Sequence, residues 1–382
     1  MTDWIAAEEA RARLGVRPQT LYAYVSRGRV HVRQDPDDPR RSLYRAADIA
    51  ALAERKMRSR RPADVAAGAI AFGEPVLASA ITTVADGRLF YRGRDAAALA
   101  ETETLESVAR LLRGGHGASL KRVRRPPPAL PTPTARAFAA LAARAAMDPP
   151  ALGRDPLRLS ADAAELADIV ADAMAGSTGE GPIHARLARA WGQDPAGLGA
   201  DLIRRALVLL ADHELNASTF AARVAASTGA SLAASALAGL AALSGPRHGG
   251  AGAALRVFAE EAARRGPAAA LAARLAEDRP VPGFGHQLYA GVDPRAEALL
   301  RRFAPSPLFV DLAAAVRAGT GAEPNIDYAL AALADAHGLP DDAPFVLFAT
   351  ARCAGWLAHA LEQLQARAVI RPRARYVGPD PL

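Results

Sequence analysis

Cysteine is almost absent from the 382-residue sequence, which contains only Cys353. One thiol cannot form an internal disulfide, and low cysteine usage is typical of reducing compartments. No run of 18 or more apolar residues lacks charges, glycine or proline, which argues against a membrane span. The first residues show neither the basic nor the apolar segment of a secretory signal. We therefore expect a cytoplasmic protein with no membrane partner.

Metal-ligand spacing is also lacking. Histidine, cysteine and aspartate form no local cluster of the kind that binds zinc, so the sequence predicts no metal site. Aromatic residues make up only 5% of the chain, although hydrophobic residues make up 51%. A composition rich in alanine and leucine but poor in aromatics favours a helical protein with a sizeable core. The length allows two or three domains.

Positive charge is concentrated at one end of the chain. Residues 1–61 contain 14 basic and 8 acidic residues, a net charge of +6, while the remainder is close to neutral at +1. A basic segment on a neutral body indicates an anionic partner, with nucleic acid as the first candidate.

The periodicity of this basic segment predicts small elements. Residues 4–14 have the apolar spacing of a helix, and a second helix is expected from Pro18 to Gly28. Two short strands are expected at 29–33 and 42–44, around a basic loop, and a third helix begins at Ala46. Two helices joined by a short glycine turn, followed by such a strand pair, are the outline of a winged helix-turn-helix.

The outline resembles the winged helix-turn-helix domains of the excisionase and MerR type and implies a separate domain over residues 1–61. The alternative is an adaptor that only packs on the body. If the domain binds DNA, six side chains are expected to contact the major groove or the phosphates. They are Arg17, Gln19, Thr20 and Tyr22 for the groove and Arg40 and Arg41 for the phosphates.

The rest of the chain, residues 62–382, shows one convincing β signal. Asp86-Gly87 between two apolar segments predicts a hairpin. Residues 122–134 are basic and then rich in proline, as in a surface loop, and from Thr134 onward the pattern is helical. The small residues of 229–239 predict a tightly packed helix, either in the core or at a subunit interface.

Chemistry-bearing residues stand in two glycine-flanked segments. Ser244-Gly-Pro-Arg-His-Gly-Gly-Ala251 carries His248, and Pro282-Gly-Phe-Gly-His286 carries His286; Asp327 follows in Pro-Asn-Ile-Asp. Flanking glycines let the backbone approach a ligand closely. Two histidines and one carboxylate can deprotonate a carbon acid and polarise two carbonyl groups.

These segments are part of an ordered series that resembles citrate synthases. The series covers about residues 65–382 and consists of Asp212-His-Glu-Leu-Asn-Ala-Ser218, Gly245–Ala251, Gly283–His286 with Asp293-Pro-Arg295, Pro324–Asp327, and Arg371-Pro-Arg373. The resemblance implies a mainly helical, two-domain fold and a homodimer. A large domain would hold roughly 62–250 and 346–382, and a small mobile domain roughly 251–345.

The resemblance also implies the role of each residue. Asp327 would remove a proton from acetyl-CoA, His248 would hydrogen-bond the thioester oxygen, and His286 would polarise the ketone of oxaloacetate. Substrate carboxylates would be bound by arginines with one further histidine, and acyl-CoA would be a co-substrate with no other cofactor. These substrate-binding residues would be His213, Arg295, Arg352 and Arg371, the last reaching into the partner's site.

Alternatives remain at this stage. Family members often carry Arg or Lys near the CoA phosphates where this chain has Gln287 and Ala290. A 2-methylcitrate synthase using propionyl-CoA differs by one methylene, which active sites discriminate weakly. A DNA-binding regulator with a metabolite-sensing body is the non-enzymatic alternative.

Overall fold

The computed structural model describes residues 4–14, 16, 21, 24–25, 30–35, 38, 42–58, 77–115, 126–289, 291–374, 376 and 378. The chain divides into two compact units, which are described separately. One unit consists of Met1–Ala78 with Arg373–Leu382, and the other of Ser79–Pro372. The domain boundary predicted between residues 61 and 62 lies outside the described residues and stays a prediction.

The first unit combines a small sheet with helices. Its described elements are β1 (Trp4–Ala6), α1 (Ala7–Leu14), β2 (Val32–Gln34), β3 (Ser42–Arg45) and α3 (Ala46–Arg58). The strands are antiparallel in the order β1-β3-β2. Ile5 lies opposite Tyr44, and both side chains are buried with Leu14 and Ile49 in a small core.

Two predictions for this unit are confirmed and one is wrong. Strands β2 and β3 pair close to the predicted positions, and α3 begins at Ala46 as expected. Residues 4–6 are a strand, not the start of a helix, because pairing with β3 buries Ile5 while completing backbone hydrogen bonds. The residues predicted to contact DNA lie outside the described residues: Arg17, Gln19, Thr20, Tyr22, Arg40 and Arg41.

The second unit begins with the predicted hairpin. Strands β4 (Thr82–Ala85) and β5 (Arg88–Tyr91) are antiparallel, and β6 (Arg94–Asp95) pairs with β5. The two turn residues, Asp86 and Gly87, have φ angles of 50° and 71°. Two consecutive positive φ angles are typical of a type I′ turn, whose twist matches that of the flanking strands.

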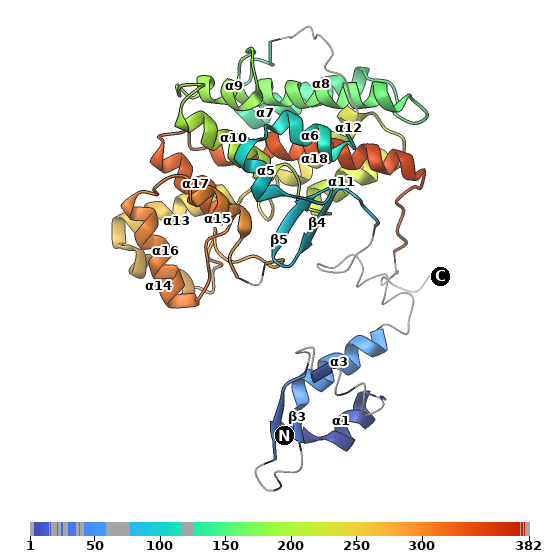
Figure 1. Cartoon of the computed structure of the whole chain (residues 1–382), viewed down its shortest axis with the longest axis vertical. Coiled ribbons are helices and arrows are strands. Elements are labelled where there is room, and N and C mark those ends of the chain that lie inside the picture. The colour runs from blue at the N-terminus through green and yellow to red at the C-terminus, as the bar shows by residue number, and fades with distance from the viewer. Residues whose placement is uncertain are drawn as a thin grey trace. The chain divides into compact units, whose positions relative to one another are not determined.

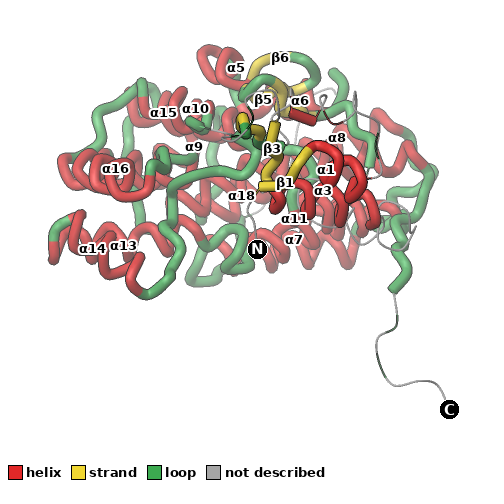
Figure 2. Tube along the Cα trace, turned by 90° about the horizontal axis from the view of Figure 1, so that it is seen from below, coloured by secondary structure: helices red, strands yellow, loops and turns green. Residues whose placement is uncertain are grey.

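Helices make up nearly all the remaining described structure of this unit (Figures 1 and 2). The predicted helical pattern from Thr134 onward is confirmed. The helices are α5 (Ala96–Thr102), α6 (Leu105–Leu112), α7 (Pro133–Met147), α8 (Pro156–Ala175), α9 (Ile183–Ala190), α10 (Leu198–Leu210), α11 (Ala217–Ser227), α12 (Leu232–Leu243), α13 (Ala251–Arg265), α14 (Pro267–Ala276), α15 (Pro294–Leu300), α16 (Pro307–Thr320), α17 (Ile326–Ala336) and α18 (Ala343–Ala366).

Helix α18 lies at the centre of the main hydrophobic core and packs against α8, α10, α11 and α12. Its residues Ala349 to Ala360 are all buried, which explains why the segment is apolar all round except for a few polar positions. Those polar positions include Arg352 and His359. A charged group this deep in a core requires partners or a ligand.

A second, smaller core lies among α13, α14 and α16, with residues such as Leu255, Phe258, Leu312 and Tyr328. These helices lie together in Figure 1, beside α15 and α17. Helix α17 joins the two cores, because Tyr328 packs in the smaller one and Leu330 in the larger one. The smaller core falls within the predicted subdomain 251–345, whose mobility stays a prediction.

None of the helices in the described parts of the chain combines the length and apolar character needed to cross a membrane.

Candidate active site

His248 lies in the turn between α12 and α13. The two glycines that follow it are required by backbone crowding. A Cβ atom on Gly249 would lie 2.4 Å from the Leu243 carbonyl oxygen, and one on Gly250 would lie 2.6 Å from that of Pro246. Contacts this short do not occur in proteins, so the tight turn that presents His248 depends on glycine at both positions.

A hydroxyl group anchors the His248 ring. Its Nε2 lies 2.8 Å from the Ser218 Oγ, which also accepts a hydrogen bond of 3.1 Å from the Trp356 indole. Asn216 caps α11 and is 2.7 Å from the same hydroxyl. The ring is packed against Phe348, with centroids 6.2 Å apart. One imidazole nitrogen is therefore committed to the protein, which leaves the other for a ligand.

His286 and Asp327 are brought together by two loops that pair. The Gly285 amide donates to the Glu323 carbonyl at 2.8 Å, and the Asn325 amide donates to the Gly283 carbonyl at 2.9 Å. Gly283 and Gly285 both have positive φ, 84° and 71°, which the loop conformation requires. The glycine loop that carries His286 therefore lies beside the start of α17.

Asp327 occupies the first turn of α17 but does not cap it. The side chain of Asn325 accepts the amides of Asp327 and Tyr328 and is the N-cap. Within the described residues, no group donates a hydrogen bond to the Asp327 carboxylate. Burial raises the pKa of Asp327 to about 6; Arg295 and Arg352 oppose the rise, and Asp293 adds to it. A carboxylate with this pKa is suited to act as a base near neutral pH.

His213 and His286 lie in one aromatic cluster with Tyr289. The two imidazole centroids are 5.2 Å apart, and His286 is 4.7 Å from the Tyr289 ring. The His213 Nε2 lies 2.9 Å from the Tyr289 hydroxyl. His213 is buried, whereas His286 is partly exposed.

Arg295 is held by a carboxylate that also organises the site. Its guanidinium donates to Asp293 Oδ1 at 3.0 Å and Oδ2 at 2.8 Å, a bidentate pair with both side chains buried. Asp293 Oδ2 accepts the Ile326 amide at 3.0 Å as well. The start of α15 is thereby linked to the start of α17. The guanidinium lies 5.6 Å from the centroid of the Tyr289 ring.

Arg352 presents an unpaired donor inside the protein. Its side chain is 1% exposed, its Nε donates to the Leu210 carbonyl at 3.1 Å, and its guanidinium lies 4.7 Å from the Phe348 ring. Nη2 has no hydrogen-bond partner among the described residues. Burial lowers the pKa of Arg352 to about 10, so it is charged at neutral pH. A buried, charged guanidinium with one unpaired nitrogen is suited to bind an anion.

The histidines of the site are neutral at neutral pH. Burial, followed by the nearby Arg352, lowers the pKa of His248 to about 4. Burial and then Arg295 lower the pKa of His286 to about 4 as well. A neutral imidazole has one N–H, which can donate a hydrogen bond, and one nitrogen without a proton, which can accept one.

The remaining predicted residue lies apart. Arg371 is exposed in the extended segment that follows α18. This segment leaves α18 at the end of the helix that is remote from α15 and α17 (Figure 1). Within the described residues, no group of three or more histidine, cysteine or acidic side chains could hold a metal ion.

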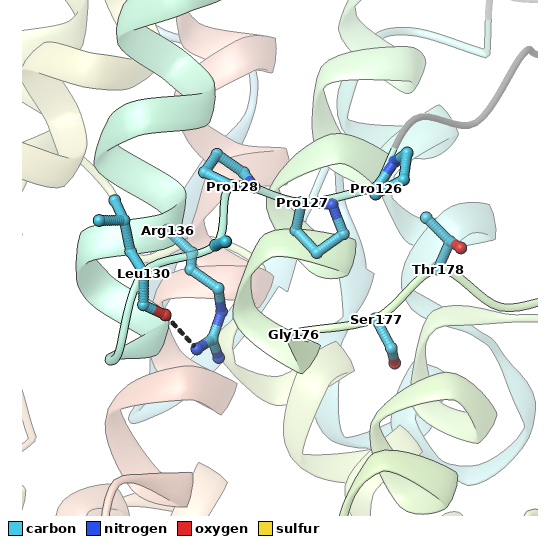
Figure 3. Close-up of a pocket in the computed structure, with 9 residues that line it drawn as sticks. Pro126, Pro127, Pro128, Leu130, Arg136, Gly176, Ser177 and Thr178 are labelled. Carbon is cyan, nitrogen blue, oxygen red and sulfur yellow. Dashed lines mark hydrogen bonds between the residues drawn. The ribbon is translucent and has the colours of Figure 1, made fainter.

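A surface pocket elsewhere contains none of these groups. Pro126–Leu130 and Gly176–Thr178 line it, together with Arg136 (Figure 3). The Arg136 guanidinium donates to the carbonyls of Leu130 and Ala173, so it serves to close the end of α8. The chemistry therefore lies in the cluster of histidines, not in this pocket.

Comparison with known protein families shows which family this chain belongs to. The family model described as citrate synthase, C-terminal domain, matches residues 117–373. The chain belongs to the citrate synthase family. The predicted motifs His213, His248, His286, Arg295, Asp327 and Arg352 all fall within the matched range.

Two curated relatives show the range of names in the family. Citrate synthase 2 of Bacillus subtilis is 34% identical over 200 residues, which are 50% of this chain and 54% of the relative. The 2-methylcitrate synthase of Shewanella oneidensis is 32% identical over 201 residues, 50% of this chain and 54% of the relative. The chain thus spans about half the length of the curated relatives it matches.

The likeness in three dimensions extends further. The citrate synthase of Thermotoga maritima, at 27% identity, superposes with a TM-score of 0.66 over 81% of this chain and 95% of that chain. The predicted mainly helical citrate synthase fold is confirmed.

Three residues that complete the site were not predicted to act. Ser218 ends the motif that begins at Asp212. A small polar residue near the start of a helix is usually a cap, so nothing in the sequence indicated a catalytic role for it. Tyr289 follows His286 by three residues, and Asp293 precedes Arg295 by two. The contacts of Ser218 with His248 and of Tyr289 with His213 join distant segments, as does the link from Asp293 to the start of α17, so only the tertiary structure shows them.

Proposed function

We propose that this protein condenses acetyl-CoA with oxaloacetate and hydrolyses the resulting thioester to citrate and CoA. The observation that carries the proposal is the unpaired Nη2 of buried Arg352 near a free carboxylate, Asp327, and two neutral histidines. The charged donor suits an anionic substrate, and the carboxylate and histidines suit enolisation of a thioester.

The first step removes a proton from the methyl carbon of acetyl-CoA. The Asp327 carboxylate takes this proton, and the electron pair of the C–H bond moves toward the thioester oxygen. His248 donates a hydrogen bond to that oxygen and stabilises the charge as it develops. The Ser218 hydroxyl engages Nε2, which leaves Nδ1 for the substrate. Donation to the thioester oxygen requires the ring proton to be on Nδ1, with the single Ser218 hydroxyl proton turned from Asn216 Oδ1 toward Nε2.

The second step forms the carbon–carbon bond. The enol carbon attacks the ketone carbon of oxaloacetate, and His286 donates a hydrogen bond to the ketone oxygen as it becomes an alkoxide. The alkoxide takes its proton from solvent, and Asp327 returns the methyl proton to solvent. Arg352 and Arg295 bind the carboxylates of the dianion, and His213 orients the substrate from the adjoining wall. Water then cleaves the thioester, which releases the CoA thiol and makes the condensation effectively irreversible.

Thiol release tests the proposal directly. The purified protein is given oxaloacetate with either acetyl-CoA or propionyl-CoA, and free thiol is measured. We expect turnover that requires oxaloacetate and a higher kcat/KM with acetyl-CoA. A preference for propionyl-CoA would make the protein a 2-methylcitrate synthase, and no thiol release with either would contradict enzymatic activity.

We also propose that the enzyme is a homodimer in which Arg371 of the partner subunit completes each site. The proposal is supported by the exposure of Arg371 outside the cluster of its own chain. Closure of the subdomain 251–345 over the remaining helices would assemble the site, because His248 precedes α13 whereas His286 and Asp327 belong to the subdomain.

The basic first unit is proposed to bind DNA as a winged helix-turn-helix. The net charge of +6 on residues 1–61 and the antiparallel strands β2 and β3 support this proposal. We expect the full chain to bind duplex DNA with an affinity that falls as salt increases, since phosphate contacts release counterions. Salt-insensitive or absent binding would leave the unit a packing adaptor.

A further inference from the structure

Three positions on one face of α18 hold the loop that carries His213. Arg352, Gly355 and His359 are spaced by three and four residues, so they line one side of the helix. Arg352 Nε donates to the Leu210 carbonyl. A Cβ atom on Gly355 would lie 2.3 Å from Asp212 Oδ1, so α18 approaches Asp212 as closely as a helix can. His359 then contacts the other oxygen of the same carboxylate.

The contact between His359 and Asp212 is buried and directional. His359 Nε2 lies 3.2 Å from Asp212 Oδ2, and the side chains are 1% and 0% exposed. The other ring nitrogen, Nδ1, lies 3.1 Å from Nη1 of Arg223. A guanidinium can only donate, so Nδ1 must be the acceptor. The proton of the neutral ring is therefore on Nε2 and is donated to Asp212.

Arg223 is itself fixed from the far side. Its guanidinium donates to Glu362 at 2.6 Å and to Gln363 at 3.0 Å, and Glu362 also accepts the Ala80 amide at 2.8 Å, ahead of the hairpin. A continuous line of hydrogen bonds thus runs from Glu362 through Arg223 and His359 to Asp212. Arg223 donates both to Glu362 and to His359, and His359 donates to Asp212.

We infer that His359 is a positioning residue for oxaloacetate binding, which it supports by holding Asp212 and hence the segment 210–213. This inference rests on the proposed function for the identity of the substrate. Two groups that face the substrate depend on the segment: the His213 ring follows Asp212 directly, and Arg352 is oriented by the Leu210 carbonyl. Among the described residues, the hydrogen bonds of the His359 ring go to Asp212 and Arg223, not to a site histidine or to Asp327. Loss of its hydrogen bond should therefore weaken substrate binding more than it slows the chemical step.

The test compares two substitutions of one residue in the full-length protein. His359→Gln keeps an acceptor for Arg223 and a donor for Asp212, whereas His359→Leu fills a similar volume but has neither. We measure kcat and KM for oxaloacetate by thiol release and the Kd for oxaloacetate by titration calorimetry. His359→Leu should raise KM and Kd about tenfold to hundredfold, as expected for a lost hydrogen bond to a buried charge, with kcat changed less. His359→Gln should stay within about threefold of wild type.

Leu361→Ala serves as the stability control, because Leu361 packs on the core from the same helix outside the line of hydrogen bonds. It should lower Tm without changing KM or Kd. Unchanged KM and Kd in His359→Leu, or equal losses in the Gln and Leu variants, would overturn the inference. If the Leu variant does not fold, His359→Asn replaces it, since the shorter amide cannot reach both partners. Wild-type protein that binds oxaloacetate but releases no thiol would refute the proposed reaction while leaving the binding comparison valid.

Discussion

At the scale of single residues, the division of labour between Asn325 and Asp327 explains how a base is left free. Both lie at the start of α17, where exposed backbone amides attract polar side chains. Asn325 accepts those amides, so the carboxylate two residues later is not needed as a cap. Burial without a donor then raises its pKa to about 6.

Replacing Asp327 with asparagine should abolish turnover while leaving the fold intact. The amide has nearly the same shape but cannot take the methyl proton, and loss of a positioned base reduces rates about 10²–10⁴-fold. We expect kcat to fall by this factor in the thiol-release assay and the Kd for oxaloacetate to stay nearly unchanged. A variant that keeps more than half of the wild-type kcat would contradict the assignment.

The pH dependence of kcat should show the Asp327 titration. The base acts only when ionised, so kcat should fall as the pH drops through about 6, the pKa to which burial raises Asp327. The histidines stay neutral across this range, because their pKa values are about 4. A rate profile from pH 5 to 8 measures this limb, and a kcat that stays constant down to pH 5 would contradict the assignment of the base to Asp327.

At the scale of elements, the site depends on how closely two helices approach. Gly239 of α12 lies against the Trp356 ring of α18, and a Cβ atom there would be 2.6 Å from that ring. Trp356 in turn donates to Ser218, which contacts His248. The sequence left two roles open for the small residues of 229–239, packing in the core or at a subunit interface. The contact of Gly239 with Trp356 is packing within the core.

Gly239→Ala should destabilise the protein and reduce kcat. The added methyl group must displace a fully buried indole, and overpacking of this kind costs about 1–3 kcal/mol. Gly199→Ala is the matched control in α10, because its Cβ meets only the end of the Gln193 side chain, which can move. The control should be neutral or slightly stabilising. Urea unfolding of both variants measures the difference, and equal stabilities would rule out the packing argument.

At the scale of the whole molecule, the shared site can be tested by mixing inactive chains. Asp327→Asn and Arg371→Ala are each expected to be inactive. In a heterodimer, one of the two sites would combine the native Asp327 of one chain with the native Arg371 of the other. About half of the wild-type activity should return. Without a shared site both sites stay defective, so verified heterodimers without activity would refute the arrangement.

Stability should also depend on pH through the neutral histidines. The folded-state pKa values of His213, His248 and His286 lie below 6.5, so the unfolded chain binds protons first as the pH falls. The stabilisation from keeping them neutral is complete above pH 6.5 and is lost toward pH 4. The raised pKa of Asp327 has the opposite effect, because the folded chain binds that proton first as the pH falls. The three lowered histidine pKa values outnumber it, so we expect a net loss of stability at low pH.

Urea unfolding at pH 7.5 and 5.5 measures this loss of stability. A double variant with asparagine at positions 248 and 286 should lose less stability between the two pH values than wild type. Equal losses would show that other groups control the pH dependence.

Much of this arrangement could be predicted from the sequence alone. The hairpin at Asp86-Gly87 is a local matter of two positive φ angles, and the helices follow from apolar periodicity over short windows. The identity of the chemical groups at His248, His286 and Asp327 was also readable, because glycine-flanked histidines are informative by themselves. The strand at 4–6 was missed because its pairing partner lies some 40 residues away in the chain.

Tertiary structure decided which of these groups are free and which are engaged. Asp293 links the start of α15 to the start of α17, Ser218 holds His248, and Arg223 fixes the proton of His359, all through contacts between segments far apart in sequence. Hydrogen bonding and burial depend on such non-local contacts, and they set the charge and direction of each group. The sequence by itself determined the residue types, the local elements and the family; the packing around α18 determined their protonation, orientation and partners.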